Sequence, residues 1–204
     1  MKKKSDYGQE LVITDLCGKR RASCDAPSMD KVLDEGRMLC GRFMGVSISR
    51  VLLNVPLQTP EDWDEVKMKR FTLVELLLKN VCDRPINIEC YSDNYVLVDS
   101  DDFQRNGTDL DNSFELAQTS GGNVPVAFPY LRGYLLDGAK TKGWLAFDEF
   151  ASGVLPKRFA FRFCGDDENG YSVTETLEFF LENCSTRPLD LEPDPLAKYA
   201  IALS

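Results

Sequence analysis

Apolar and polar side chains alternate along much of the chain, and this alternation predicts β-strands. Residues 43–52 alternate with a period of two, and residues 158–163 place three phenylalanines on one face and Arg, Ala and Arg on the other. Residues 71–78 form the most apolar run, with the length of one strand buried on at least one face. The same reasoning predicts further strands, most of them next to turn residues, at 86–90, 95–98, 131–136, 143–147 and 171–177. The chain therefore has seven or eight predicted strands and little helical pattern.

The segments between these strands are interpreted from their turn residues. Residues 86–90 and 95–98 are separated by a short polar stretch, so we expect the two strands to form a hairpin. Residues 54–69 contain two prolines and an acidic run, which predicts a long connection with one helical turn at most. Residues 99–123 are rich in Asp, Asn, Ser and Gly and predict a long loop, a kind of segment that is commonly functional or disordered.

Short strands separated by turns predict an all-β fold, and specifically an antiparallel β-sandwich, with a barrel as the alternative. We expect one domain, the sandwich, over residues 41–182. Residues 1–40 are interpreted as an N-terminal extension with a short strand or a helical turn. Residues 183–204 contain three prolines and are interpreted as a C-terminal tail.

The charge and the missing histidine exclude several functions. The chain has 204 residues, with 24 Lys and Arg against 33 Asp and Glu, a net charge of −9, and no His. Without imidazole there can be no Ser-His or Cys-His nucleophile, no His-ligated zinc site and no near-neutral imidazole switch. Because binding to phosphates needs clustered positive charge, the acidic balance also argues against nucleic acid as a partner.

The cysteines and the apolar runs give evidence about the cellular location. The seven cysteines are odd in number and form no Cys-x-x-Cys pair, which predicts a reduced protein with mostly buried thiols. The basic start of the chain continues with polar residues where an export signal needs an apolar stretch. No window approaches the roughly 18 consecutive apolar residues of a membrane span. We therefore expect no transmembrane segment and a cytoplasmic location. If an export signal is removed, we expect an extracellular or periplasmic location instead.

Three stretches, in order, resemble a known family. Residues 71–80, followed by Asp-Arg-Pro-Ile at 83–86, are similar to its strand ending in K-N and its D-K/R-P turn. Residues 96–102 are similar to its L-x-D-S-D-G strand end, and residues 136–147 to its L-x-P-G-x-x-x-x-G-x-x-x-F turn and strand. The family is the bacterial immunoglobulin-like domains of unknown function, typified by small secreted antigens and lipoproteins. The resemblance covers residues 43–164 and departs at Asp102, where Gly is usual, and at Asp137, where Pro is usual. It implies an immunoglobulin-like sandwich and no catalytic residue.

Acidic loops are candidates for calcium, which takes about 6–8 oxygen ligands. Asp99, Asp101 and Asp102 form the first cluster, and residues 166–168 form the second. Neither has the Gly and the terminal Glu of an EF-hand loop at the right offsets. The three aspartates at 99–102 are therefore a candidate metal site, although solvated turn residues are the interpretation that the sequence favours.

Two aromatic residues are candidates for ligand binding. Trp63 lies among four acidic residues, a context that indicates exposure, and Tyr95 could offer a stacking surface for a sugar or a peptide. A pair of carboxylates could also hydrolyse a glycoside, but with 33 acidic residues nothing singles out one pair. The Ser-Gly at 152–153 lacks the G-x-S-x-G context of a nucleophile elbow.

These observations predict a protein that is not an enzyme and needs no cofactor. The leading hypothesis is an immunoglobulin-like domain that binds another protein through its loops or an exposed sheet edge. A calcium-stabilised carbohydrate-binding module is the alternative, and a carboxylate-based hydrolase is the third. The partner and the oligomeric state do not follow from the sequence.

Overall fold

The computed structural model describes residues 8–22, 32–33, 38–59, 67–88, 92–108, 114–116, 127–128, 131, 133–166 and 172–188. These residues form strands and one short 3-10 turn, and every strand pairing among them is antiparallel. The predicted all-β, antiparallel fold is therefore confirmed. The elements are β1 (Gln9–Ala22), β2 (Val32–Leu33), β3 (Met38–Cys40), β4 (Met44–Thr59), β5 (Lys67–Asn80), β6 (Ile86–Ile88), η1 (Ser92–Asn94), β7 (Tyr95–Asp99), β8 (Gln104–Thr108), β9 (Phe114–Leu116), β10 (Ala127–Phe128), β11 (Gly133–Leu135), β12 (Lys140–Asp148), β13 (Pro156–Asp166) and β14 (Ser172–Pro188).

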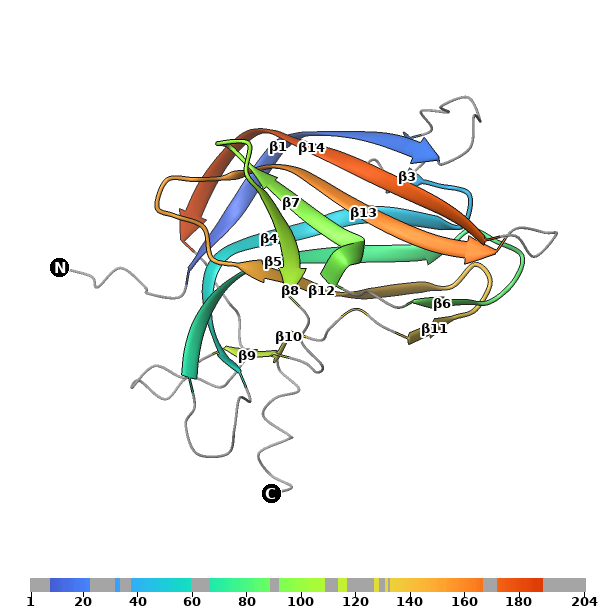
Figure 1. Cartoon of the computed structure of the whole chain (residues 1–204), viewed down its shortest axis with the longest axis horizontal. Helices are drawn as coiled ribbons and strands as arrows, with labels where there is room; N and C mark the ends of the chain where they lie inside the picture. Colours follow the sequence, from blue (N-terminus) through green and yellow to red (C-terminus); the bar gives the residue numbers. More distant parts are fainter. Residues whose placement is uncertain are drawn as a thin grey trace, which may run out of the picture.

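Eight strands close the main sheet into a barrel. They follow the order β1, β14, β13, β7, β8, β12, β5, β4, and β4 pairs back with β1. Figure 1 shows β1, β14 and β13 along one side, with β5 and β12 along the other. This differs from a sandwich of two separate sheets, because the pairing of β4 with β1 joins the two ends of the strand order.

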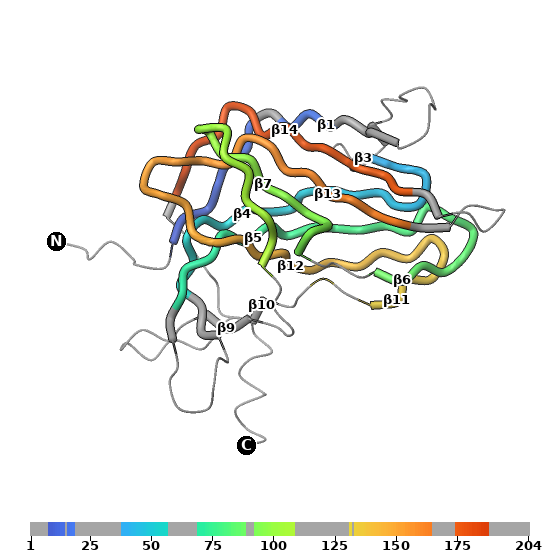
Figure 2. Tube along the Cα trace, in the orientation of Figure 1, coloured from blue at the N-terminus to red at the C-terminus, as the bar shows by residue number. Residues whose placement is uncertain are grey.

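Irregularities in β4 explain the closure. The pairing of β4 with β5 shifts register between Ile48 and Arg50 and again between Leu52 and Val55. Asn54, in the second shift, has a positive φ of 54°. Because a bulge bends a strand and increases its twist, β4 leaves the direction of the sheet and comes to lie beside the start of β1 (Figure 2).

Several sequence predictions on connections are corrected by the pairing. Most of residues 54–69 continue the β4–β5 hairpin as strand, and Pro56 pairs opposite Arg70. The expected loop at 99–123 contains β8 and β9, and β8 forms a hairpin with β7. The predicted hairpin of β6 with β7 is wrong: β6 pairs with β11, and β7 lies between β8 and β13.

Parts of the expected N-terminal extension and C-terminal tail belong to the barrel. β1 comes from the segment interpreted as an N-terminal extension, and it pairs with β14 along its length, from Gln9 opposite Pro188 to Ala22 opposite Glu175. Since β14 extends to Pro188, the first residues of the expected tail are strand as well.

Aromatic rings fill the inside of the barrel. The ring of Phe147 lies edge-on to Tyr95 with centroids 5.3 Å apart, and edge-on to Phe159 at 6.3 Å. Phe159 lies 6.1 Å from Phe179. The alternation of β13 is confirmed, since its three phenylalanines are buried and Arg162 is exposed. Burying side chains of this size contributes about 1.5–3 kcal/mol each, so this cluster adds substantially to the stability of the core.

Candidate functional site

The three aspartates predicted to bind calcium lie in the turn between β7 and β8. Asp99 is 1% exposed, and its Oδ1 accepts the backbone N–H groups of Asp101 at 3.0 Å and Phe103 at 2.9 Å. Its Oδ2 lies 3.2 Å from Nη2 of Arg105. Burial by itself raises the pKa of Asp99, but the N–H of Phe103, the Arg105 guanidinium and the N–H of Asp101 outweigh it and lower that pKa.

The other two aspartates have different roles in this turn. Asp102 forms an ion pair with Lys157 and has a φ of 68°, the region that glycine adopts most readily. Asp101 is exposed. Within the residues that the structure describes, no group of three Cys, Asp or Glu is placed to hold a metal. The geometry shows a turn built around Asp99, and calcium binding here stays a prediction.

The predicted ligand-binding aromatics are not brought together. Trp63 lies outside the described residues. Tyr95 is 1% exposed, and its hydroxyl donates to the backbone oxygen of Thr108 at 3.1 Å. Its ring belongs to the core, so in this structure Tyr95 offers no surface to a ligand, contrary to the prediction.

A small ribbon of two strands presents apolar side chains that the sequence did not single out. β6 and β11 pair with each other, and no other strand of the described chain pairs with them. Tyr134 is 69% exposed and Leu136 is 59% exposed, whereas Leu135 between them is buried. Tyr134 is therefore an exposed residue of β11, and Leu136 is an exposed residue directly after this strand.

The ribbon is held by a buried amide. Asn80 is fully buried, and its Nδ2 donates to the backbone oxygens of Arg84 at 2.7 Å and Leu135 at 3.2 Å. Its Oδ1 accepts the N–H of Cys82 at 2.9 Å. Asn80 thus ties the turn after β5 to β11, and the buried side chains of β6 anchor the ribbon in the core.

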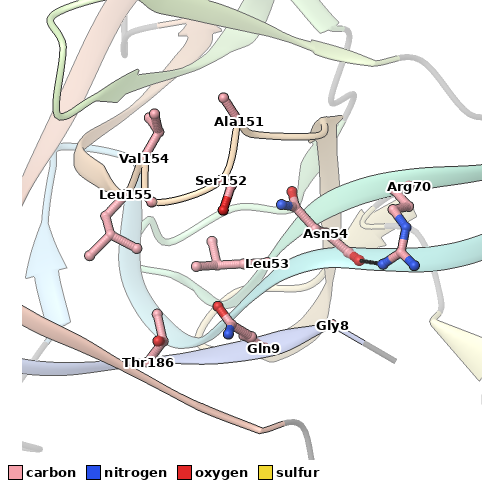
Figure 3. A pocket seen from close by; sticks show the side chains of 11 residues that line it. Gly8, Gln9, Leu53, Asn54, Arg70, Ala151, Ser152, Val154, Leu155 and Thr186 are labelled. Carbon is pink, nitrogen blue, oxygen red and sulfur yellow. Dashed lines mark hydrogen bonds between the residues drawn. The ribbon is translucent and has the colours of Figure 1, made fainter. Parts of the chain in front are cut away.

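A cavity of about 600 Å³ opens at the opposite end of the barrel (Figure 3). Among the described residues, its walls come from the start of β1, the bulge of β4, Arg70 of β5, the β12–β13 loop and the end of β14. The bulge is fixed to the loop, because Asn54 donates from Nδ2 to the oxygen of Phe150 at 2.9 Å and accepts the N–H of Phe150 at 2.8 Å. The lining residues are Gly8, Gln9, Leu53, Asn54, Arg70, Ala151, Ser152, Gly153, Val154, Leu155 and Thr186.

The barrel closes beside this cavity through a buried carboxylate. Glu10 of β1 is 8% exposed and accepts from Nε of Arg50 on β4 at 3.1 Å and from Nη2 of Arg187 on β14 at 2.8 Å. Burial alone raises the pKa of Glu10, but the hydrogen bonds and charges of the two guanidinium groups lower it below its ordinary value. Sequence reasoning missed this group because its members are far apart along the chain.

Five of the seven cysteines lie among the described residues, and all five are free thiols. Cys17 and Cys164 are exposed and the other three are half-buried, so the expectation of mostly buried cysteines does not hold for these five. Burial raises the pKa of Cys40, Cys82 and Cys184, which makes these thiols less reactive. The described part of the chain also contains no helix with the length and apolarity that crossing a membrane requires.

No family model matches the chain, and no curated protein matches it in sequence. Three solved structures are weakly similar. The yjhA protein from Bacillus subtilis is 13% identical, with a TM-score of 0.39 over 62% of this chain and 79% of that one. The lipoprotein candidate ycdA from Bacillus subtilis is 16% identical, with a TM-score of 0.35 over 68% and 37%. A functionally unknown protein from Listeria monocytogenes is 13% identical, with a TM-score of 0.39 over 91% and 90%. Similarities of this size carry no argument about function.

Proposed function

We propose that this protein is a non-catalytic domain that binds another protein through the outward face of the β6–β11 ribbon. The observation that carries the proposal is the exposure of Tyr134 and of the nearby Leu136 at an anchored ribbon. Single exposed apolar residues are ordinary, but tyrosine is among the residues enriched at the energetic centres of protein interfaces, and Leu136 adds apolar surface near it. Rigid support matters because little conformational entropy is then lost on binding.

The immunoglobulin-like relationship is part of this proposal. The antiparallel strands around an aromatic core support it, as does the positive φ at Asp102, where the family usually has Gly. The relationship implies no catalytic residue, which agrees with a role in binding.

Paired capture experiments test the proposal. The full-length wild type and a Tyr134→Ser, Leu136→Ser double variant are immobilised and exposed to a lysate of the native source. Phe103→Ser is the matched control, because Phe103 is 68% exposed but lies in the β7–β8 turn. We expect the wild type and the control to retain the same partner.

The double variant should bind that partner at least about thirtyfold more weakly, since an aromatic centre contributes about 2 kcal/mol or more. Its melting temperature should stay unchanged, because both side chains are exposed. Equal retention by the double variant would show that the ribbon is not the binding face.

The expectation of a reduced, cytoplasmic protein without a cofactor also remains a proposal. The free thiols among the described residues support the first part of it. Counting thiols in denatured protein from the native source should give all seven as reactive. A lower count would indicate disulfides and an oxidising compartment.

A further inference from the structure

The cavity at the end of the barrel is lined by neutral polar side chains. Gln9, Ser152 and Thr186 are exposed, and their side chains form no hydrogen bond with another described residue. In Figure 3 the amide of Gln9, on β1, and the hydroxyl of Ser152, on the β12–β13 loop, point into the same space. Each of the three groups can both donate and accept hydrogen bonds, so together they can bind the hydroxyl groups of a ligand.

The same cavity has an apolar side. The side chain of Leu53 also points into the space in Figure 3, and the half-buried Val154 and Leu155 belong to the same wall. A volume of about 600 Å³ lies within the range of small-molecule sites, which is about 300–1,000 Å³. The cavity therefore offers hydrogen bonds and an apolar contact to one small ligand.

Contacts behind the walls hold them in place. Asn54 bonds the bulge of β4 to Phe150, and the N–H of Ser100 donates to the backbone oxygen of Leu155 at 2.7 Å. The start of β1 lies so close to β4 that a Cβ atom at Gly8 would be 2.6 Å from a backbone oxygen of that strand. Since the walls are already ordered, little conformational entropy is lost when a ligand binds.

These groups favour one kind of ligand. An apolar ligand would displace water from the polar side chains without replacing the hydrogen bonds of that water, which costs free energy. A ligand with hydroxyl groups along one side and C–H groups along the other satisfies both parts of the wall. A sugar ring has this arrangement.

We propose that this cavity binds a neutral sugar ring. The hydroxyl groups of the sugar would bond to Gln9, Ser152 and Thr186, and its C–H face would pack against Leu53 and Leu155. A free monosaccharide and the end of a glycan chain share this chemistry. The inference does not depend on the proposed function, because the β6–β11 ribbon lies at the other end of the barrel (Figure 1).

Methyl glycosides test the site on the full-length, isotope-labelled protein. The probes are the methyl glycosides of glucose, galactose, mannose and N-acetylglucosamine, and tetrahydropyran is the matched ring without hydroxyl groups. Binding is followed by the backbone amide shifts of residues 8–9, 152–155 and 186, which line the cavity. We expect at least one glycoside to move these resonances and tetrahydropyran to move none. Because the ligand is neutral, about 0.5 M NaCl should leave its affinity unchanged.

Variants of the wall identify the groups that bind. Ser152→Ala and Thr186→Val each remove one hydroxyl group and should weaken binding of that glycoside about fivefold, the change expected for one hydrogen bond. Ser185→Ala and Thr14→Val are the matched controls, because both residues are exposed on strands outside the cavity, and affinity should stay unchanged in them. Ser152→Phe fills the cavity from an exposed loop position and should abolish binding, while its melting temperature stays that of the wild type.

A trisaccharide of the same sugar separates the two sources. Tighter binding of the trisaccharide than of the methyl glycoside supports the site with a glycan end as its ligand, and equal or weaker binding supports it with a free monosaccharide. No binding of any glycoside at about 50 mM, equal binding of tetrahydropyran, loss of affinity in salt, shifts only outside the cavity, or an equal loss in the control variants would overturn the inference.

Discussion

The pairing that closes the barrel is short, and one carboxylate bridges it. β1 and β4 pair only at Gln9 with Leu53 and at Glu10 with Leu52. Glu10 connects three strands, because its oxygens accept from Arg50 of β4 and from Arg187 of β14. We predict that Glu10→Gln destabilises the protein while keeping the shape of the side chain.

The magnitude follows from the number and exposure of these contacts. Hydrogen bonds between charged groups contribute about 1.5–3 kcal/mol, but solvent reduces this for exposed partners. The side chain of Arg187 is 63% exposed and that of Arg50 is 34% exposed, so we discount the first more strongly. Glutamine also retains one acceptor. The expected loss in the free energy of unfolding is about 1–2 kcal/mol, or about 2–8 °C in melting temperature for a chain of this length.

The effect should depend on pH in a direction fixed by the lowered pKa of Glu10. A carboxylate whose pKa is lower in the folded state stabilises that state fully above the ordinary value of 4.5, and this stabilisation is lost as the pH falls through the lower, folded-state pKa. Glutamine does not titrate. The difference between wild type and variant should therefore be largest near neutral pH and disappear in acid.

Thermal unfolding followed by circular dichroism, at about pH 7 and about pH 3, measures both effects. Glu182→Gln is the matched control, since Glu182 is an exposed carboxylate on β14, and its melting temperature should stay within about 1 °C of the wild type. A double-mutant cycle with Arg50→Gln should give a coupling energy of about 1 kcal/mol. Equal melting temperatures at neutral pH, or a difference that persists in acid, would refute the reasoning.

Three further predictions concern other polar side chains that bond to the backbone. Glu175, which is 2% exposed, accepts the N–H groups of Arg42 and Phe43, so Glu175→Gln should cost about 2 kcal/mol in urea denaturation, and no change would contradict that role. Asn54→Ala removes both hydrogen bonds to Phe150, and hydrogen exchange should accelerate in the β12–β13 loop while the β6–β11 ribbon serves as the unchanged reference. Because the oxygens of Asp99 already have N–H and guanidinium partners, millimolar calcium should move the melting temperature by less than about 1 °C; a rise of several degrees would restore the calcium hypothesis.

Some features of the fold follow from local pattern and were predicted for that reason. The run at 71–78 and the alternation at 158–163 are strands with the expected buried positions, because period two places alternate side chains on one face. For β7, by contrast, the local pattern does not identify the buried face. Val96 and Val98 lie on the side opposite to Tyr95 and are apolar too, so the pattern does not say which face is the core. For that reason the sequence offered Tyr95 as a candidate stacking surface, whereas its ring lies in the core.

What the sequence by itself determined is the strand content, the antiparallel class and the exclusion of imidazole chemistry, since each depends on neighbouring residues or on composition. Only the tertiary structure decided which strands pair, because pairing depends on contacts between distant residues. The bulge at Asn54 turns β4 towards β1, and Glu10 meets Arg187, which is 177 positions away. The cavity lies beside the bulge at Asn54. Its wall combines the start of β1 and the end of β14 with the β12–β13 loop, and no local pattern brings those segments together.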